Sequence, residues 1–211
     1  MNSGWPRSGH GLRGLYLITP DEGETARLLG RVRAVLRHAA LLQYRNKVAD
    51  DALKREQVAA LLPLCHEVGV PLIINDDWAL ARELGADGAH LGKDDGELRV
   101  ARALLGDGAI LGASCYDDIA RAETAATAGA SYLAFGAFFP SPTKPDARRA
   151  KPQLLQASAH LGLPRVAIGG ITPDNARQLV VAGADMVAVI SGVFDAPDPA
   201  VAAHAYRACF D

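Results

Sequence analysis

Short apolar runs alternate along the whole chain with longer stretches in which apolar residues recur at helical spacing. The short runs are almost continuously apolar, which is typical of parallel strands covered on both faces. Eight such strands are predicted: Gly14–Thr19, Leu41–Arg45, Pro71–Asp76, Gly88–Gly92, Ala109–Cys115, Tyr132–Ala137, Arg165–Gly170 and Met186–Ser191. The stretches between them are long enough for crossover helices and include Thr25–His38, Lys54–Val68, Glu97–Leu105, Asp117–Ala128 and Pro173–Val181.

A small motif recurs between a predicted helix and the next predicted strand. It is Gly85-Ala86-Asp87, then Gly129-Ala130-Ser131, then Gly183-Ala184-Asp185, at intervals of 44 and 54 residues. The glycine supplies the left-handed residue that ends a helix. Thr172-Pro173 marks a helix start, with an N-cap residue before proline at the first helical position. A motif that returns every two strand–helix units is what a barrel of eight such units leaves in its sequence.

We therefore predict an α/β fold: a single (β/α)8 TIM barrel over residues 1–211, with residues 1–13 as a flexible N-terminal extension. The alternative is an open, doubly wound sheet. That fold often carries a glycine fingerprint after its first strand, and Ile18-Thr19-Pro20-Asp21 has none.

Composition narrows the classes of function. The 22 basic and 24 acidic residues give a net charge of −2, so we expect no nucleic-acid partner and no attraction to an acidic membrane. No apolar run reaches the ~18 residues of a membrane span, and the first residues lack the apolar segment of a signal peptide. Cys65, Cys115 and Cys209 form no metal or disulfide pattern, so a reducing cytoplasm is predicted. The sequence carries no signal for the oligomeric state.

Polar residues gather after the predicted strands, at the end of the barrel where enzymes of this fold carry out their chemistry. Four of the five lysines fall there: Lys47, Lys93, Lys144 and Lys151. Arg45, Lys47 and Lys144 provide charge-assisted donors suited to phosphate. Gln43, Arg45 and Lys47 alternate along a strand end, so we expect all three on its inner face. Polar groups there are costly unless they bind a ligand.

Two further features point to phosphate chemistry. Asp76 and Asp95 offer hard oxygen ligands, and few carboxylates among many phosphate donors suit Mg²⁺ bound to a diphosphate. The loops Gly169-Gly170 and Ile190-Ser191-Gly192 offer backbone N–H groups to a second anion, a common use of the last two loops of a barrel. Two anion sites imply two phosphorylated substrates, or one substrate with phosphate at both ends.

Several of these residues also have plain structural explanations, which the sequence leaves open. Gly169-Gly170 can be a simple turn, and Asp95 can cap the next helix rather than bind metal. Cys115 is expected to pack as a small hydrophobic residue, and His90 to pack within its own strand.

Six motifs, in order and at matching spacing from about Leu15 to Phe194, resemble the thiamine-phosphate synthase family. They are Gln43-Tyr44-Arg45-Asn46-Lys47, Ile74-Asn75-Asp76-Asp77, His90-Leu91-Gly92-Lys93-Asp94-Asp95, Gly112-Ala113-Ser114, Pro140-Ser141-Pro142-Thr143-Lys144 and Ile168-Gly169-Gly170-Ile171. The resemblance implies a Mg²⁺-dependent barrel enzyme, a transferase that joins 4-amino-5-hydroxymethyl-2-methylpyrimidine diphosphate to a thiazole phosphate alcohol. The products are thiamine monophosphate and diphosphate. Lys93 departs from the glutamine that many relatives carry there, which adds positive charge near the metal.

The resemblance also assigns roles to residues. The pyrimidine diphosphate would be held by Gln43, Tyr44, Arg45, Asn46, Lys47, Asn75, Ser114 and Lys144. The thiazole phosphate would be held by Ser141, Pro142, Thr143, Gly170, Ile190 and Ser191. Asp76 and Asp95 would ligate Mg²⁺, and Ser114 and Lys144 would act on the leaving diphosphate.

The implied reaction is a dissociative substitution, in which the diphosphate leaves first and the thiazole nitrogen then attacks. It needs positioning and electrostatic stabilisation rather than a nucleophilic side chain. Three alternatives remain: a thiazole tautomerase of the same superfamily, a sugar-phosphate epimerase, and a non-catalytic phosphate-binding regulator. The tautomerase should need a proton-transfer residue near Ser114-Cys115-Tyr116. The epimerase leaves the Gln43 to Lys47 pattern unexplained, and the regulator needs no metal ligands.

Overall fold

Eight parallel strands form a closed barrel in the computed structural model, which describes residues 11–92, 95–140 and 149–211, with the backbone alone for 95–97. The strands pair in chain order, and β8 closes the barrel against β1 with Gly14 beside Met186. Their bounds are β1 Gly14–Ile18, β2 Ala39–Tyr44, β3 Leu72–Asn75, β4 Gly88–Leu91, β5 Ile110–Tyr116, β6 Tyr132–Gly136, β7 Arg165–Ile168 and β8 Met186–Val189. The predicted barrel is confirmed.

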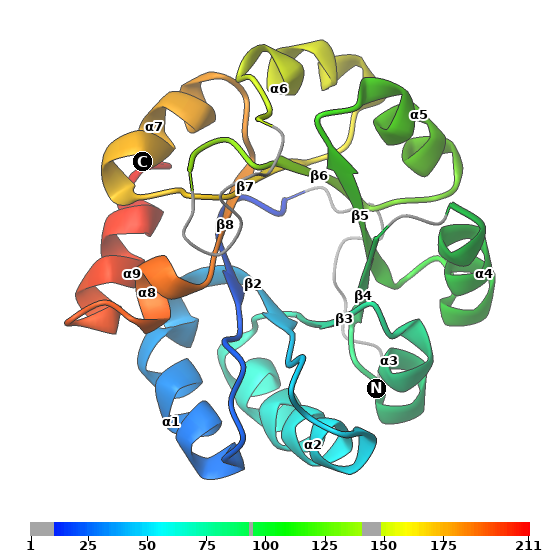
Figure 1. Ribbon diagram of the computed structural model, residues 1–211. Helices are drawn as coiled ribbons and strands as arrows, with labels where there is room; N and C mark the ends of the chain where they lie inside the picture. Colours follow the sequence, from blue (N-terminus) through cyan, green and yellow to red (C-terminus); the bar gives the residue numbers. More distant parts are fainter. Residues whose placement is uncertain (1–10, 93–94, 141–148) are drawn as a thin grey trace.

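Helices surround the barrel as an outer ring (Figure 1). They are α1 Thr25–Val35, α2 Asp51–Val68, α3 Trp78–Leu84, α4 Asp95–Leu105, α5 Ile119–Thr127, α6 Gln153–Ala157, α7 Pro173–Val181, α8 Ser191–Phe194 and α9 Pro199–Ala208, with short 3₁₀ turns at Leu36–His38 and Ala159–Leu161. The bounds of α7 match the prediction. Helix α2 begins three residues before the predicted Lys54, because the Asp50 carboxylate accepts a hydrogen bond from the Leu53 amide and caps the helix.

Strands β7 and β8 each end two residues before the predicted bound. Gly169 and Gly170 have φ angles of 100° and 62°, so the chain leaves the extended conformation as soon as Ile168 is passed. Ser191, predicted as the last residue of β8, is instead the first residue of α8. Both differences shorten the strands and lengthen the rim loops that were proposed to bind phosphate.

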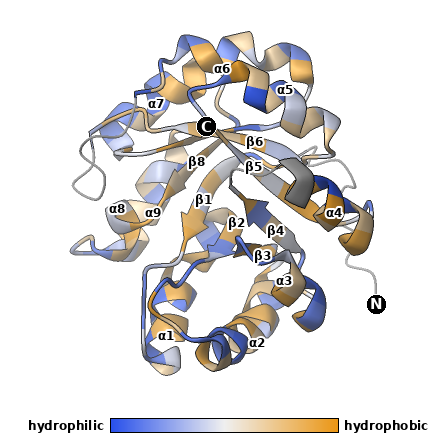
Figure 2. Ribbon diagram, turned by 45° about the vertical axis from the view of Figure 1, so that its right-hand side comes forward, coloured by the Kyte–Doolittle hydropathy of each residue, from blue (hydrophilic) through white to orange (hydrophobic). Residues whose placement is uncertain are grey.

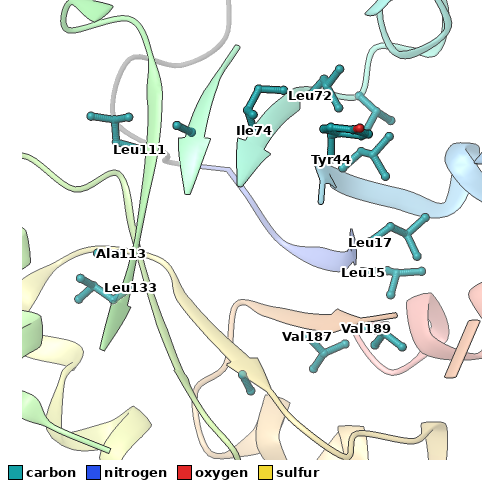
Figure 3. Packing of buried hydrophobic residues seen from close by; sticks show 14 of the residues in the cluster. Leu15, Leu17, Tyr44, Leu72, Ile74, Leu111, Ala113, Leu133, Val187 and Val189 are labelled. Atoms are coloured by element: carbon teal, nitrogen blue, oxygen red, sulfur yellow. The ribbon is translucent and has the colours of Figure 1, made fainter. Parts of the chain in front are cut away.

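Alternation along the strands creates two apolar cores. Leu15 and Leu17 of β1 pack outward under the helices, together with Leu72 and Val187 of other strands (Figure 3). The intervening residues point into the barrel, where the interior cluster consists of Tyr16, Ile18, Leu41, Ile73, Ile110, Tyr132, Ala134, Val166, Met186 and Ala188. Figure 2 shows apolar segments in the strands and a mixture of apolar and hydrophilic residues along the surrounding helices. The interior is therefore packed, and ligands have access only at the ends.

At the end of the barrel where β1 begins, residues near the two ends of the protein are in contact. Arg13 donates a hydrogen bond to the Phe210 carbonyl oxygen at 3.2 Å, and its guanidinium lies 5.4 Å from the centre of the Phe210 ring. Residues 1–10 of the predicted N-terminal extension lie outside the described residues. Within the described ranges, no helix combines the length and apolar character needed to cross a membrane.

Candidate active site at the barrel rim

A cavity of about 440 Å³ opens beside the carboxyl ends of β2 and β3. Its lining includes the cations Arg45, Lys47 and Lys54 and the carboxylates Asp76 and Asp77. Lys54 is the one lysine that the sequence pattern did not place on the rim. It reaches the cavity from the first turn of α2, which begins earlier than predicted. Three cations and two carboxylates in one cavity suit a diphosphate that shares a metal ion with the protein.

The segment from Arg45 to Lys47 is held in place by the loop that follows β1. Thr19 Oγ1 donates to the Arg45 carbonyl oxygen at 2.8 Å and accepts from the Arg45 amide at 2.9 Å. Asp21 accepts from the Lys47 amide at 2.8 Å and forms an ion pair with the Arg45 guanidinium at 3.3 Å. Gln43 lies within β2, as predicted. Strand β2 ends at Tyr44, so Arg45 and Lys47 lie beyond it and do not share a strand face with Gln43.

Tyr44 and Asn46 line the cavity, but their side chains form hydrogen bonds with other residues of the protein. The Tyr44 hydroxyl donates to Gln57 Oε1 at 2.8 Å. Asn46 Nδ2 donates to the Glu22 carbonyl oxygen at 2.7 Å and to Gln57 Oε1 at 3.0 Å. The Tyr44 ring also points away from the barrel axis, toward Leu72 and the surrounding helices (Figure 3). We therefore treat both residues as supports for Arg45 and Lys47 and leave them out of the proposed ligand set.

Gln57 is a functional support that the sequence analysis missed. It is fully buried in α2, accepts from Tyr44 and Asn46, and donates to the Glu22 carbonyl oxygen at 2.8 Å. It thus joins the loops after β1 and β2. The only sequence signal for this role is a glutamine within a predicted helix. Helical periodicity does not show that its side chain is buried or which loop it contacts.

We expect Gln57→Leu to lower the free energy of unfolding by about 3 kcal/mol, because it leaves the buried Tyr44 hydroxyl without a partner and removes one hydrogen bond each from Asn46 Nδ2 and the Glu22 carbonyl oxygen. The KM for the pyrimidine diphosphate should rise as the Arg45 to Lys47 segment loosens. Urea unfolding and steady-state kinetics measure the two effects. Gln156→Leu, on the exposed surface of α6, is the matched control and should change neither. Equal behaviour of the two variants would remove Gln57 from this account.

Asp76 is set apart from its neighbour Asp77 by its backbone. Its φ angle is 60°, in the left-handed region that non-glycine residues rarely adopt, and such strain is concentrated at functional sites. Its carboxylate accepts from Asn75 Nδ2 at 2.8 Å and lies near Gly92 at the end of β4. The Asp77 carboxylate instead caps α3 by accepting from the Leu80 amide at 2.8 Å. Asp76 is therefore the carboxylate that is free to serve a ligand.

The donor set fits a shared Mg²⁺. Among the described residues there is no group of three or more potential protein metal ligands. Mg²⁺ bound to a substrate diphosphate needs only one or two protein carboxylates, with the remaining positions taken by phosphate oxygens and water. Asp76 meets this requirement. Asp95 begins α4 three residues after Gly92, but its side chain lies outside the described residues.

A chain of hydrogen bonds crosses the barrel interior just beneath the rim. Gln43 Nε2 donates to the Tyr16 hydroxyl at 2.5 Å, and the Tyr16 and Tyr132 hydroxyls are 2.7 Å apart. The Tyr132 hydroxyl lies 2.9 Å from His90 Nδ1, and His90 Nε2 lies 2.9 Å from Ser114 Oγ. His90 does lie buried within β4, as predicted, and both of its ring nitrogens are engaged. Burial lowers the pKa of His90 to about 4, so the imidazole is neutral at physiological pH.

The loops after β7 and β8 are brought together by Tyr206, which the sequence analysis missed. Its hydroxyl donates to the Ile171 carbonyl oxygen at 2.8 Å, and it packs so closely on Gly192 that a Cβ there would lie 2.3 Å from the hydroxyl oxygen. Gly170 and Ser191, each next to one of these contacts, are thus on neighbouring loops. Ile190 packs over the interior cluster. The remaining predicted residues, Ser141, Pro142, Thr143 and Lys144, lie outside the described residues, as does Lys93.

These features define the class: a (β/α)8-barrel enzyme whose rim is built for phosphorylated small molecules. Residues 15–193 match the family model described as thiamine monophosphate synthase. The thiamine-phosphate synthase of Xanthomonas campestris pv. campestris is 62% identical over 94% of this chain and 96% of its own length, and that of an Azoarcus species is 57% identical over 96% and 99%. The chain belongs to the thiamine monophosphate synthase family and is a transferase of thiamine biosynthesis.

Solved structures agree with this assignment. A thiamine phosphate pyrophosphorylase from Pyrococcus furiosus superposes with a TM-score of 0.82 at 33% identity, covering 97% of this chain and 96% of that one. A 3-hexulose-6-phosphate synthase, with a TM-score of 0.71 and 18% identity over 93% of this chain and all of that one, shares the fold alone.

Proposed function

We propose that this enzyme joins 4-amino-5-hydroxymethyl-2-methylpyrimidine diphosphate to 4-methyl-5-(2-hydroxyethyl)thiazole phosphate, forming thiamine monophosphate and diphosphate. The observation that carries the proposal is the cavity lined by Arg45, Lys47, Lys54 and Asp76, on the same rim as a separate pair of loops at Gly170 and Ser191. The first set of residues suits a metal-bound diphosphate, and the second suits a monophosphate held by backbone N–H groups. One rim with two unlike anion sites matches one substrate of each kind.

In this proposal Arg45, Lys47 and Asn75 hold the diphosphate, while Gln43 and Ser114 meet the substrate at the two ends of the interior hydrogen-bond chain. Asp76, together with Asp95, would hold Mg²⁺, which when bound supplies positive charge to the diphosphate oxygens. Ser141, Pro142, Thr143, Gly170, Ile190 and Ser191 remain the proposed contacts of the thiazole phosphate.

The reaction breaks the bond between the pyrimidine methylene carbon and the diphosphate oxygen, and that oxygen keeps the electron pair. The ring amino group stabilises the resulting carbocation, and the thiazole nitrogen lone pair then forms the new carbon–nitrogen bond. The cations and the Ser114 hydroxyl stabilise the charge that grows on the leaving diphosphate. Holding both substrates on one rim makes the second step effectively unimolecular. No side-chain nucleophile is required.

The family and the rim both favour this reaction over the alternatives. The hydroxyl of Ser114 at the end of β5 bonds to a buried imidazole rather than standing beside an exposed proton-transfer residue, which a tautomerase would need. All three cysteines lie within the described ranges and are free, and a cytoplasmic location remains our expectation from the sequence.

Incubation of the purified enzyme with both substrates and Mg²⁺ tests the proposal. We expect thiamine monophosphate and diphosphate in equal amounts, and neither product when one substrate is omitted or EDTA is added. Formation of an isomerised thiazole from a single substrate would instead identify a tautomerase.

Lys144→Ala should lower the rate of the bond-forming step about 100-fold at saturating substrate, while the dissociation constant of the thiazole phosphate changes little. The lysine charge is proposed to act on the leaving diphosphate, so its contribution grows in the transition state. Single-turnover kinetics measures this rate. Lys151→Ala, which removes an exposed lysine from the same segment, is the control. A normal single-turnover rate with weakened thiazole phosphate binding would reassign Lys144 to the second site.

A further inference from the structure

The hydrogen-bond chain beneath the rim joins five strands and is enclosed by the barrel. Gln43 belongs to β2, Tyr16 to β1, Tyr132 to β6, His90 to β4 and Ser114 to β5. Tyr16 and Tyr132 are at most 1% exposed. Their rings pack edge to face with centroids 5.8 Å apart, and the His90 ring stacks on Tyr132 at 5.7 Å. The hydroxyl of Tyr132 is the central link, since the segments to Gln43 and to Ser114 meet there.

The orientation of the Gln43 amide gives the hydrogen-bond chain one direction. Gln43 Nε2 donates to the Tyr16 oxygen, so the single Tyr16 hydrogen is available to Tyr132, and the Tyr132 hydrogen to His90 Nδ1. His90 Nδ1 is then the acceptor, and Nε2 carries the proton that is donated to Ser114 Oγ. While Gln43 Nε2 is the donor, the opposite direction would make Tyr16 accept twice and leave its own hydrogen without an acceptor among its described partners. Burial raises the pKa of both tyrosines, so both hydroxyls keep the proton that this order requires.

The order determines what each end offers to a ligand. Within the described part of the chain, Gln43 Oε1 and the Ser114 hydrogen have no hydrogen-bond partner. One end therefore presents an acceptor, and the other presents a donor. Turning the Gln43 amide by 180° would reverse the whole hydrogen-bond chain, and each end would then present the opposite group.

The glycine beneath the chain shows that this arrangement is built into the fold. A Cβ on Gly112 would lie 2.1 Å from the Tyr132 hydroxyl oxygen and 2.4 Å from His90 Nδ1. The link between Tyr132 and His90 therefore passes directly over the Gly112 backbone, in space that any other residue would fill. The sequence showed this glycine only as part of a family motif.

We infer that Tyr132 is a positioning residue that couples the hydrogen-bond polarity of the two ends of the pyrimidine diphosphate site. This inference rests on the proposed function. Gln43 Oε1 accepts from the ring amino group, whose N–H becomes a stronger donor as the ring gains positive charge. The Ser114 hydroxyl donates to the diphosphate oxygen as that oxygen gains negative charge. Both interactions strengthen toward the transition state. The hydrogen-bond chain therefore raises kcat more than it raises the affinity for the substrate.

The first test uses the protein without substrates. Long-range ¹H–¹⁵N NMR distinguishes a protonated from an unprotonated imidazole nitrogen, and a His90→Gln variant identifies the His90 signals. We expect unprotonated Nδ1 and protonated Nε2 in the wild type. Tyr132→Phe removes the donor to Nδ1 and should produce a mixture of tautomers. Tyr16→Phe leaves that donor in place and should retain the wild-type tautomer. Protonated Nδ1 in the wild type, or an unchanged His90 in Tyr132→Phe, would overturn the inference.

The second test is kinetic. Tyr132→Phe should lower kcat about tenfold or more and leave the KM for the thiazole phosphate unchanged. Tyr206→Phe, which removes a buried hydroxyl beside the other site, should raise that KM and leave the His90 tautomer as in the wild type. An unchanged kcat in a folded Tyr132→Phe enzyme would overturn the inference. Absence of thiamine monophosphate formation by the wild type would contradict the proposed function instead, and the His90 signals would still decide the direction of the chain.

Discussion

Asp76→Asn should lower kcat/KM by at least about 100-fold at Mg²⁺ concentrations that saturate the wild type. The reason is the loss of one of the two carboxylates proposed to hold the metal against the diphosphate. Asparagine is the informative substitution because it tolerates the left-handed backbone at φ 60° and keeps an oxygen that can accept from Asn75. The fold should therefore survive, and part of the activity should return at much higher Mg²⁺.

The adjacent Asp77→Asn is a matched control. Asparagine caps helices about as well as aspartate, so α3 should keep its N-terminus and the Mg²⁺ dependence should not change. Initial rates across a Mg²⁺ titration, with circular dichroism to verify folding, compare the two variants. A nearly normal rate and an unchanged Mg²⁺ dependence in Asp76→Asn would remove Asp76 from the metal site.

Gly170→Ala should raise the KM for the thiazole phosphate by more than about tenfold and leave binding of the pyrimidine diphosphate unchanged. Gly170 has a φ angle of 62°, and a Cβ there would lie 2.3 Å from the Pro140 carbonyl oxygen and 2.7 Å from that of Phe139. The loop after β7 must then move away from the loop after β6. The backbone N–H groups proposed to hold the phosphate move with it.

Gly69→Ala separates this clash from the general cost of a left-handed alanine. Gly69 ends α2 with a φ angle of 69°, and a Cβ there would meet nothing within 4 Å. It should lose about 1 kcal/mol of stability and keep normal kinetics. Separate calorimetric titrations of the two substrates complete the comparison. Equal loss of both substrates in folded Gly170→Ala would contradict the division of the rim into two sites.

The fold could be predicted largely because each strand is covered on both faces. An almost continuous apolar run, such as the one in β2 that contains Leu41 and Leu42, marks a strand of this kind. The eight predicted runs correspond in order to the eight strands. Errors occurred at the ends of helices and strands, where individual side chains and backbone angles determine the last residue. Asp50 extends α2, and the positive φ angles of Gly169 and Gly170 shorten β7. Apolar patterns carry little information about such local hydrogen bonds and backbone angles.

The sequence predicts those site residues whose location follows from their position directly after a strand. Residues that follow parallel strands meet at one rim, which is how Arg45, Lys47 and Asp76 were found. The alternation that placed Gln43 inside also places Tyr44 outside, and this signal was available in the sequence. The contacts of Gln57 and Tyr206 depend on how helices pack against loops, and the chain from Gln43 to Ser114 depends on the register of five strands. Neither can be obtained from spacing alone.

A crystal structure with Mg²⁺, diphosphate and thiamine monophosphate would test the central claim most directly, namely that one rim carries two different anion sites. We expect the metal on Asp76 and Asp95, the diphosphate against Arg45 and Lys47, and the phosphate of the product on the backbone at Gly170 and Ser191. Both anions in the cavity beside β2 and β3, or a metal bound away from Asp76, would contradict the account.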